Sequence, residues 1–407
     1  MIMQDNEKKP ALRFKGFTDP WEQRKFSDIT FPAGEKNRDN LPLESYSITN
    51  EHGFIPQDEK FENGGTMREA DKRMYYIVSP NSFAYNPARI NVGSIGYQNT
   101  GKDVIVSSLY EVFKTSDDVD DRLLWHWFKS PDFQKLIFQL QEGGVRLYFY
   151  YDKLCMGTVS LPSLEEQRKI GQFFDSLDTL ITLHQRKYEK LVNIKKSMLD
   201  KMFPQNGASV PEIRFKGFTD PWEQRKLDEI ANFSKGVGYS KNDLCEEGTP
   251  IILYGRLYTK YETSIFDVDT FVKEKAGSVY SKGGEVIVPA SGETAEDISI
   301  ASVVVKPGIL LGGDLNIVSP TTEYDSAFLA LTISSGAAHE YLSSLAQGKS
   351  VVHLHNADIQ SVSAKFPTKR EQEKIHLLFG KIDTLITLHQ REHIKPILEV
   401  KRVKRNE

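Results

Sequence analysis

The chain has 407 residues, of which 39% are apolar and 27% are charged, as is typical of a globular protein with two or three domains. Its 52 Lys and Arg residues are outnumbered by 56 Asp and Glu residues. The resulting net charge of -4 excludes a histone-like protein that coats nucleic acid by bulk charge, so any contact with a polyanion must be local.

No stretch near the start resembles a signal peptide, and the longest apolar runs, at 300–305 and 327–333, are too short to cross a membrane. We therefore expect a cytoplasmic protein without a membrane contact. Two cysteines, Cys155 and Cys245, are too few for a disulfide framework or a cysteine-rich zinc site. Both are expected to be small buried hydrophobic side chains.

An internal repeat is the most informative feature of the sequence. The residues RFKGFTDPWEQRK occur at 13–25 and again, unchanged, at 214–226, which is 201 residues later. The residues DTLITLHQR occur at 178–186 and again at 383–391, which is 205 residues later. The chain is therefore a duplication in which near-identical blocks flank divergent stretches.

The first repeated block predicts a turn that leads into a short helix. Asp19 supplies an N-cap, Pro20 suits the first helical position, and Glu22 completes a capping box. The equivalent residues of the second half repeat this arrangement. Trp21 and Trp222 are predicted to be hydrophobic anchors of their domains, with a partner-binding role as the alternative.

The second repeated block predicts a long helix in each half, opened by Pro162 or Pro367. Apolar residues recur there at alternating steps of four and three, the heptad spacing of a coiled-coil seam. Because the helices belong to equivalent halves, we expect an intramolecular antiparallel coiled coil about a pseudo-twofold axis. The predicted seam residues are Ile170, Phe174, Leu177, Ile181 and His184 in the first helix and Ile375, Phe379, Ile382, Ile386 and His389 in the second.

Two features of the long helices carry further expectations. His184 and His389 stand at seam positions, where partly exposed packing is expected, with a ligand role as the alternative. Pro396 is expected to end the second helix, because an interior proline loses a backbone hydrogen bond and clashes with the preceding turn.

The divergent stretches, roughly 26–161 and 227–366, are predicted to be globules with twisted sheets. Strand-like runs such as 74–80 and 285–291 are broken by Gly, Asn and Pro turns, and a pair of helical patterns precedes each long helix. The expected fold class is mixed α/β, with two globular domains separated by two long helices.

One short segment differs between the halves in a way that suits recognition. At 146–150, apolar Leu147 and Phe149 alternate with polar residues, so a strand there would bury one face and present the other. Segment 351–355 keeps the apolar positions and changes the polar ones. Unlike hydrogen-bonding side chains on one frame are what base reading requires, although an exposed face without function is the alternative. The presented side chains are Arg146, Tyr148 and Tyr150 in the first half and His353 and His355 in the second.

A zinc site at the two histidines lacks a third ligand in the sequence. Basic and amide side chains in turns are further candidates for contacts to phosphates or bases, with solvated loop charges as the alternative. These candidates are Lys36, Arg38, Arg89, Asn91, Lys102, Lys235, Lys241, Arg256, Lys260 and Lys349.

Patterns typical of enzymes are incomplete in this sequence. The segment 348–350 lacks the first glycine of a phosphate-binding loop, and 93–96 lacks a glycine of a nucleophile elbow. Segments 86–87 and 131–132 likewise lack the partners that a methyltransferase or nuclease motif requires. A binding protein without catalytic or metal-ligating residues is therefore favoured over an enzyme with an unrecognised site.

The two RFKGFTDPWEQRK blocks, the Pro-x-x-x-Glu-Gln entries at 162–167 and 367–372 and the DTLITLHQR helices resemble the DNA-specificity subunit of type I restriction-modification systems. The resemblance covers essentially the whole chain. It implies a non-catalytic subunit with two target-recognition domains, 1–161 and 205–366, separated by spacer helices at 162–204 and 367–407, the latter with a basic tail.

The resemblance also implies partners. Two methyltransferase subunits and restriction subunits would dock on the chain and would carry S-adenosylmethionine, ATP and magnesium, whereas this chain would bind no cofactor itself. Methylation would fall on adenine amino groups of double-stranded DNA. The near-identity of the repeats exceeds what a coiled-coil seam requires, so we expect both copies to bind the same surface of two identical partners.

Two unlike readers on a rigid spacer predict a split, non-palindromic target. A coil of about 22 residues would be roughly 33 Å long, close to one turn of B-DNA, which places half-site centres about 10 bp apart. Binding by the chain alone is expected to be weak and sensitive to salt. The rival interpretation is a two-headed coiled-coil scaffolding protein without sequence-specific DNA binding.

Overall fold

A computed structural model describes residues 10, 12–50, 53–60, 71–143, 147–205, 207–348 and 351–403, with side chains up to Gln390 apart from Lys60. The chain forms two compact units, Met1–Leu180 and Ile181–Glu407, and the boundary between them falls inside one long helix. We call residues 13–161 head 1 and residues 214–366 head 2. The division into four segments that we expected from the sequence stays a prediction.

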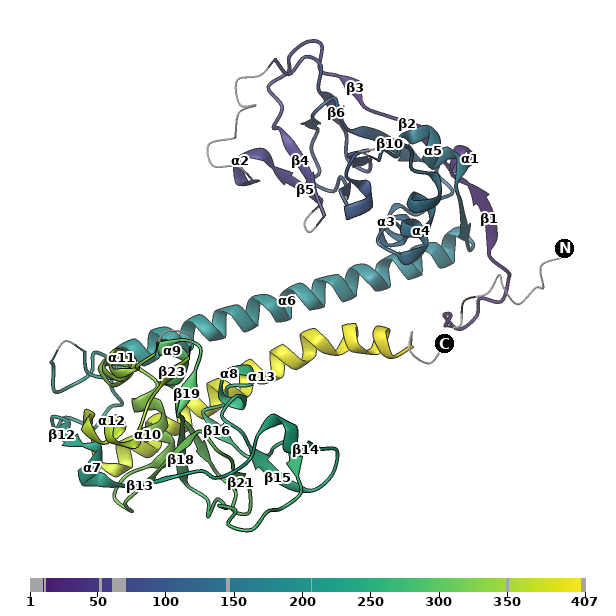
Figure 1. Ribbon diagram of the computed structural model, residues 1–407. Helices are drawn as coiled ribbons and strands as arrows, with labels where there is room; N and C mark the ends of the chain where they lie inside the picture. The colour runs from purple at the N-terminus through teal and green to yellow at the C-terminus, as the bar shows by residue number, and fades with distance from the viewer. Residues whose placement is uncertain are drawn as a thin grey trace. The chain divides into compact units, whose positions relative to one another are not determined.

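The first unit is a mixed α/β globule followed by the start of the long helix (Figure 1). In chain order its elements are β1 (Glu22–Lys25), α1 (Phe26–Ile29), β2 (Thr30–Pro32), β3 (Glu35–Lys36), β4 (Tyr46–Thr49), β5 (Gly53–Pro56), α2 (Gln57–Lys60), β6 (Tyr76–Val78), β7 (Phe83–Tyr85), η3 (Ile90–Val92), β8 (Ile95–Tyr97), β9 (Val104–Val106), β10 (Glu111–Thr115), α3 (Asp121–Phe128), α4 (Pro131–Leu140), α5 (Tyr151–Met156), β11 (Thr158–Leu161) and α6 (Leu164–Met202).

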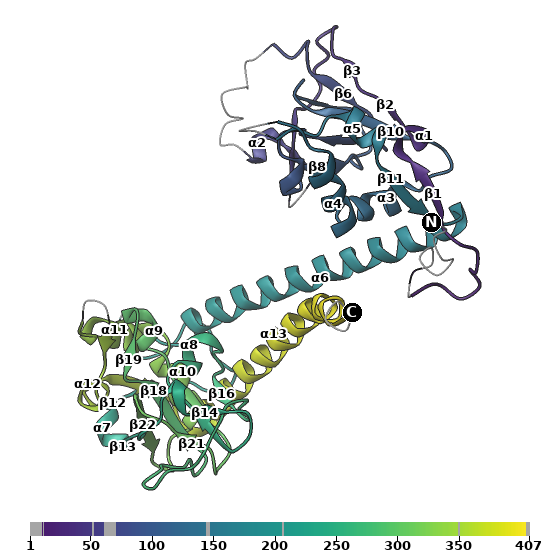
Figure 2. The ribbon, with the colours of Figure 1, turned by 45° about the vertical axis from the view of Figure 1, so that its right-hand side comes forward.

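An aromatic core holds head 1 together. Strands β2, β10, β7 and β8 form an antiparallel sheet, and Phe83 and Phe113 stack on it with ring centroids 5.1 Å apart. Phe128 of α3 and Phe133 of α4 pack at 4.8 Å in the same core. The helix pair predicted ahead of the first long helix is confirmed by α3 and α4, whose N-caps are Asp120 and Ser130. Figures 1 and 2 both show α3 and α4 beside the first turns of α6.

The second unit repeats this plan with larger sheets. In chain order its elements are β12 (Glu223–Lys226), α7 (Leu227–Ile230), β13 (Ala231–Lys235), η4 (Lys241–Asp243), β14 (Leu244–Cys245), β15 (Thr249–Ile252), α8 (Arg256–Thr259), β16 (Ser264–Ile265), β17 (Phe271–Val272), β18 (Glu285–Pro289), β19 (Ser291–Gly292), α9 (Ala295–Ile298), β20 (Ser302–Val304), β21 (Leu310–Leu311), β22 (Leu315–Pro320), α10 (Ser326–Ile333), α11 (Gly336–Leu345), β23 (Val352–His353), α12 (Asn356–Ser361), β24 (Ser363–Phe366) and α13 (Lys369–Val403).

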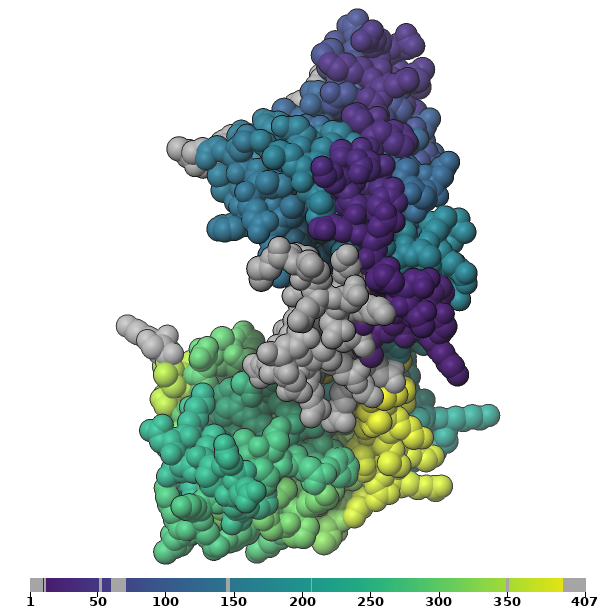
Figure 3. Space-filling view, turned by 90° about the vertical axis from the view of Figure 1, so that its right-hand side faces the viewer, coloured from purple at the N-terminus to yellow at the C-terminus, as the bar shows by residue number. Residues whose placement is uncertain are grey.

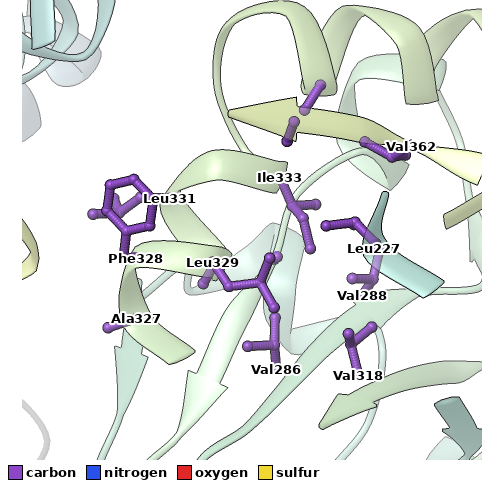
Figure 4. Packing of buried hydrophobic residues seen from close by; sticks show 14 of the residues in the cluster. Leu227, Val286, Val288, Val318, Ala327, Phe328, Leu329, Leu331, Ile333 and Val362 are labelled. Atoms are coloured by element: carbon purple, nitrogen blue, oxygen red, sulfur yellow. The ribbon is translucent and has the colours of Figure 1, made fainter. Parts of the chain in front are cut away.

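Helix α10 forms the centre of head 2. Seven of its residues, 327–333, are all buried, so the helix is enclosed on every side, as its uniformly apolar sequence requires. Figure 4 shows Leu329 and Ile333 of this helix close to Val286 and Val288 of β18. The sheet below it has the order β13-β22-β18-β20-β16, with β16 at one edge. The mixed α/β fold class is therefore confirmed in both heads.

The first repeated block forms a strand, so the predicted capped helix at 19–22 is wrong. Strand β1 pairs antiparallel with β11, and β12 pairs in the same way with β24. Long-range strand pairing here overrides a local helix-start signal.

Trp222 is 3% exposed and packs on Phe203 and Phe328, whereas Trp21 is half-buried. Both free cysteines are also only half-buried, contrary to our expectation.

Helix α13 continues to Val403, so the prediction that Pro396 ends it is wrong. A proline removes one intrahelical hydrogen bond, and the turns on either side can still keep their own. The first predicted seam residues of each helix pack against their own heads. Ile170 packs on the core of head 1, and Phe174 contacts His126 of α3 with ring centroids 5.1 Å apart. Ile375 and Phe379, at the equivalent positions of α13, are buried in head 2.

Beyond those turns, α6 and α13 pair within the second unit. Nδ1 of His184 lies 3.0 Å from Nδ1 of His389, and Nζ of Lys195 lies 2.5 Å from Oδ1 of Asp383. A later residue of α6 thus meets an earlier residue of α13, so the pair is antiparallel. Because His184 and His389 are equivalent in the repeat, the local pseudo-twofold axis passes between them, as predicted.

The other predicted seam residues lie on the less exposed side of their helices. Leu177 and Ile181 of α6 and Ile386 of α13 are half-buried, and Ile382 is 8% exposed in the core of head 2. Figure 3 shows α13, in yellow, along the edge of head 2, in green. In the described part of the chain, no helix is long and apolar enough to cross a membrane.

Candidate nucleic-acid interface

A buried clasp fixes the first turn of each long helix to its own head. Nε and Nη2 of Arg13 donate to Oε1 and Oε2 of Glu166, each at 2.7 Å. Arg214 binds Glu371 in the same bidentate way at 2.7 and 2.8 Å. Both carboxylates have 0% of their side chain exposed. The hydrogen bond to Glu371 raises the pKa of Arg214, so the guanidinium stays charged.

The neighbouring glutamine completes this arrangement. Oε1 of Gln167 accepts from the backbone N–H of Asp120 at 2.9 Å, and its Nε2 donates to the carbonyl of Pro162 at 2.9 Å. Gln372 makes the same two bonds, to Asp325 at 2.9 Å and to Pro367 at 2.8 Å. The glutamine thereby locks the helix start to the N-cap of α3 or α10.

Sequence reasoning found these residues as a repeated motif and missed what they do. The clasp joins residues 153 positions apart in head 1 and 157 apart in head 2. A signal was present, because an Arg and a Glu recur in both halves on opposite sides of a divergent stretch. Internal contacts therefore explain part of the near-identity of the repeats.

Another part of the repeated sequence faces outward. In the nonapeptide of α6, Leu180 and Leu183 are 50% and 46% exposed. At the same positions of α13, Leu385 and Leu388 are 44% and 47% exposed. Two identical leucine pairs at helical spacing thus lie on the surface of the chain, where packing inside the chain does not explain them.

The predicted recognition segments lie in equivalent hairpins. Glu142 forms an isolated bridge with Tyr148 after α4, and Gln347 forms one with His353 after α11. A glycine of positive φ follows the first bridge residue in each, with φ of 129° at Gly143 and 142° at Gly348. Arg146 and Lys349 lie outside the described residues. Of the strand expected over 146–150, the described residues 147–150 show the bridge at Tyr148 and no longer strand.

In head 1 the hairpin presents tyrosines. The rings of Tyr148 and Tyr150 are parallel, with centroids 5.6 Å apart, and Tyr150 is 47% exposed. Phe149 is buried as predicted, whereas Leu147 is 39% exposed against our expectation. The bridge at Tyr148 is followed directly by α5, whose N-cap is Tyr150, so strict strand alternation does not hold here.

In head 2 the hairpin presents imidazoles. His353 is exposed on β23, and its Nδ1 lies 3.2 Å from Oγ of Ser291 on β19. His355 is exposed at the N-cap of α12, where its backbone N–H donates to Asp358 at 2.7 Å. Within the described residues, no three His, Cys, Asp or Glu side chains group to hold a metal ion.

Basic candidates from other segments join each hairpin. The N–H of Phe149 donates to the carbonyl of Pro87 at 3.0 Å, which brings the exposed turn of Arg89 and Asn91 beside the head 1 hairpin. In head 2, Nδ2 of Asn356 donates to the carbonyl of Ser234 at 2.9 Å, beside exposed Lys235.

The remaining candidates lie on other segments, and several bind acidic neighbours. Arg256 has 8% of its side chain exposed and pairs with Glu262 at 2.8 Å and Asp269 at 2.7 Å. Hydrogen bonds from Lys260 and Arg256 lower the pKa of Asp269 to about 2. Lys102 pairs with Glu44 at 2.5 Å. Lys36 is half-buried, while Arg38 and Lys241 are exposed.

The family model for the type I restriction modification DNA specificity domain matches residues 54–193 and 219–398, which is more than half of the chain. The chain belongs to this family. One match lies in each half of the repeat, so the specificity protein carries the domain twice. Its function in DNA sequence recognition follows from this membership.

Known proteins agree with the assignment. The chain is 22% identical over 305 residues to the "Type I restriction enzyme MjaVIII specificity subunit" of Methanocaldococcus jannaschii, covering 72% of this chain and 70% of that relative. The crystal structure of a "Type-I restriction-modification system S subunit from M. genitalium" matches 98% of this chain and 97% of that one, with a TM-score of 0.58 and 13% identity. At that identity the match shows a shared fold.

Proposed function

We propose that each head reads one half of a bipartite, asymmetric target in double-stranded DNA. The observation that carries this proposal is that equivalent hairpins on one frame present Tyr148 and Tyr150 in head 1 but His353 and His355 in head 2. Each base pair offers its own pattern of donors and acceptors in the major groove, so unlike side chains at equivalent places read unlike half-sites.

The basic turns beside the hairpins supply phosphate contacts in this proposal. Arg89 lies in the turn bonded to the head 1 hairpin, and Lys235 lies next to the residue bonded to the head 2 hairpin. Such contacts fix the register of a protein on DNA without reading sequence. Arg256 has no part in this proposal because two carboxylates already neutralise it.

The specificity protein would dock two identical methyltransferase subunits, one on each exposed leucine pair, together with restriction subunits. An identical exposed surface repeated on two equivalent helices calls for the same partner twice. Those subunits would carry S-adenosylmethionine, ATP and magnesium and perform the catalysis, with adenine as the methylated base. The chain itself would act in the cytoplasm without a cofactor.

Electrostatics support the need for partners. With a net charge of -4, the chain lacks the bulk attraction that sustains tight DNA binding at physiological salt.

We expect half-site centres about 10 bp apart, one turn of the duplex, so that both heads approach the same face.

The deciding experiment is methylome sequencing of a host with and without this gene. The expected result is a gene-dependent split motif in which the two words differ. Exchanging segments 26–161 and 227–366 within the chain should reverse the order of the words. A continuous or palindromic motif would contradict the proposal, and no gene-dependent footprint beside the cognate methyltransferase would favour the scaffolding function.

A further inference from the structure

The hairpin of head 2 holds the backbone of His353 in place. Strand β23 pairs antiparallel with β19, and His353 stands opposite Ser291 in this pair. The backbone N–H and carbonyl of His353 bond to Gln347 on the other side, at 2.8 and 3.2 Å. Asn316 of β22 is buried, and its Nδ2 donates to the carbonyl of Leu354 at 2.9 Å. The backbone at His353 is therefore fixed by two neighbouring segments before any DNA is bound.

Ser291 also holds the ring of His353. Its Oγ lies 3.2 Å from Nδ1 of the imidazole, and the residue is 8% exposed. Its backbone carbonyl accepts from the hydroxyl of Tyr258, which fixes the serine in turn. Among the described residues, the imidazole is the one hydrogen-bond partner of the Ser291 hydroxyl. A buried hydroxyl whose proton lacks an acceptor is costly, so the hydroxyl donates and Nδ1 accepts.

This direction of the hydrogen bond decides which ring nitrogen of His353 carries a hydrogen. A neutral imidazole has one N–H, and with Nδ1 as acceptor that hydrogen is on Nε2. The charged imidazolium also carries a hydrogen on Nε2. Since His353 is exposed, its ring offers an N–H donor to an outside partner in either charge state.

Head 1 has no equivalent of the Ser291 hydroxyl. The hairpin N–H that binds the carbonyl of Pro87 in head 1 binds that of Ala290 in head 2, at 3.0 and 3.1 Å. The residues that follow, Ala88 and Ser291, are therefore equivalent. Tyr148 stands at the place of the histidine, and a phenol hydroxyl can donate or accept. A side chain set as a donor by its neighbour is thus a property of head 2.

We propose that His353 reads a guanine in the half-site of head 2 by donating from Nε2 to N7, and that Ser291 is the positioning residue that fixes this donor. In the major groove, guanine shows two acceptors, N7 and O6, and no donor. Adenine places an amino group beside its N7, thymine places a methyl group beside O4, and cytosine shows a donor. A fixed N–H donor therefore matches guanine best.

This inference rests on the proposed function, because it names a base within the half-site that head 2 would read. The test uses the assembled methyltransferase complex and duplexes in which each guanine of that half-site is replaced singly by 7-deazaguanine. This analogue lacks the N7 acceptor and keeps its base pairing. The wild-type complex should methylate the unmodified duplex about tenfold faster than the duplex modified at one particular guanine.

Variants assign that ratio of rates to the two side chains. His353→Ala should bring the ratio to one, because the donor is gone. Ser291→Ala and Ser291→Val should each lower it about threefold, within the range of a neutral hydrogen bond. Ser291→Thr has the shape of the valine variant but keeps the hydroxyl, so it should retain the ratio. Ser344→Ala is the control, since it removes an exposed hydroxyl of the same head that donates to the carbonyl of Tyr341, and it should leave the ratio unchanged.

A second measurement needs no DNA. Nitrogen-15 NMR of the full chain with labelled histidine, at about pH 8 where a neutral ring reports its tautomer, should show the hydrogen of His353 on Nε2. Ser291→Ala should show both tautomers. A hydrogen on Nδ1 in the wild-type chain would overturn the inference, as would equal ratios in the wild type and Ser291→Ala. A wild-type complex that methylates no split motif would instead refute the proposed function, and NMR would still show whether Ser291 sets the tautomer.

Discussion

Head 1 and head 2 are joined to their long helices by the same side-chain contacts, but they expose different side chains to solvent. The Arg13–Glu166 and Arg214–Glu371 clasps have nearly the same distances, although the stretches between their members differ in length and sequence. The hairpins that follow α4 and α11 keep only their bridge and their glycine. In each half, the clasp fits the shared scaffold and is retained, whereas the hairpin side chains have diverged.

Breaking one clasp should have the largest effect. Glu371→Gln leaves Arg214 facing a neutral amide in a buried site. We expect this change to lower the free energy of unfolding by about 2–3 kcal/mol. The loss is smaller than for a fully buried pair because 13% of the Arg214 side chain is exposed to solvent. Glu166→Gln should destabilise head 1 in the same way. Urea unfolding measures both.

The neighbouring Glu165 provides the control for that experiment. It has 74% of its side chain exposed and pairs with Lys169, one helical turn away. Glu165→Gln should therefore change the free energy of unfolding by less than about 0.5 kcal/mol. Equal losses for Glu165→Gln and Glu166→Gln would show that the clasp is not a source of stability.

The exposed leucine pairs of the two halves should be equivalent in partner binding. Leu183→Asp should remove one methyltransferase subunit and Leu388→Asp the other, with a loss of about 2 kcal/mol or more of binding free energy at each site. Both side chains are exposed, so the chain itself should fold normally. Native mass spectrometry should count one bound subunit for each single variant and none for the double variant. Two bound subunits in all variants would exclude this surface.

The sequence predicted the features that depend on local hydrophobic periodicity and on the identity of the two repeats. The repeat, the two long helices, their antiparallel pairing and the helix pairs at 121–141 and 326–347 follow from periodicity and equivalence, whereas the contact between His184 and His389 was not predicted. The clasp could not be predicted, because nothing local says that Arg13 will meet Glu166. Strand β1 was missed for the same reason, since its partner β11 lies far along the chain.

The hairpins should separate the heads most clearly in DNA recognition. Tyr148→Ala should weaken only the recognition of the first half-site. His353→Ala should weaken only the recognition of the second half-site. A lost base contact costs about 1–3 kcal/mol, which is roughly fivefold to 160-fold in rate when the complex is limiting. Methylation of duplexes with one altered half-site measures this. Variants that weaken every target uniformly would assign these residues to phosphate contacts.

The smallest expected effect concerns the N-cap aspartates of α3 and α10. Asp120 lies against Gly171, where a Cβ atom would come within 2.6 Å of its Oδ1. The equivalent of Gly171 in the second half is His376 of α13, whose Nδ1 lies 2.9 Å from Oδ1 of Asp325. The interaction with Asp325 raises the pKa of His376, against the opposing effect of burial. Burial acts to raise the pKa of Asp325, but His376 and backbone N–H groups outweigh it and lower that pKa.

These two shifts define a pH window for head 2. The raised pKa of His376 contributes stability that is complete below about pH 6.5 and lost as pH rises, and the lowered pKa of Asp325 contributes stability that is lost only in acid. His376→Ala should therefore cost up to about 1 kcal/mol near pH 5.5, limited by solvent screening, and less at pH 8. Urea unfolding at both values measures the difference. A cost independent of pH would mean that the charge of His376 contributes nothing, since only the protonated imidazole forms an ion pair with Asp325.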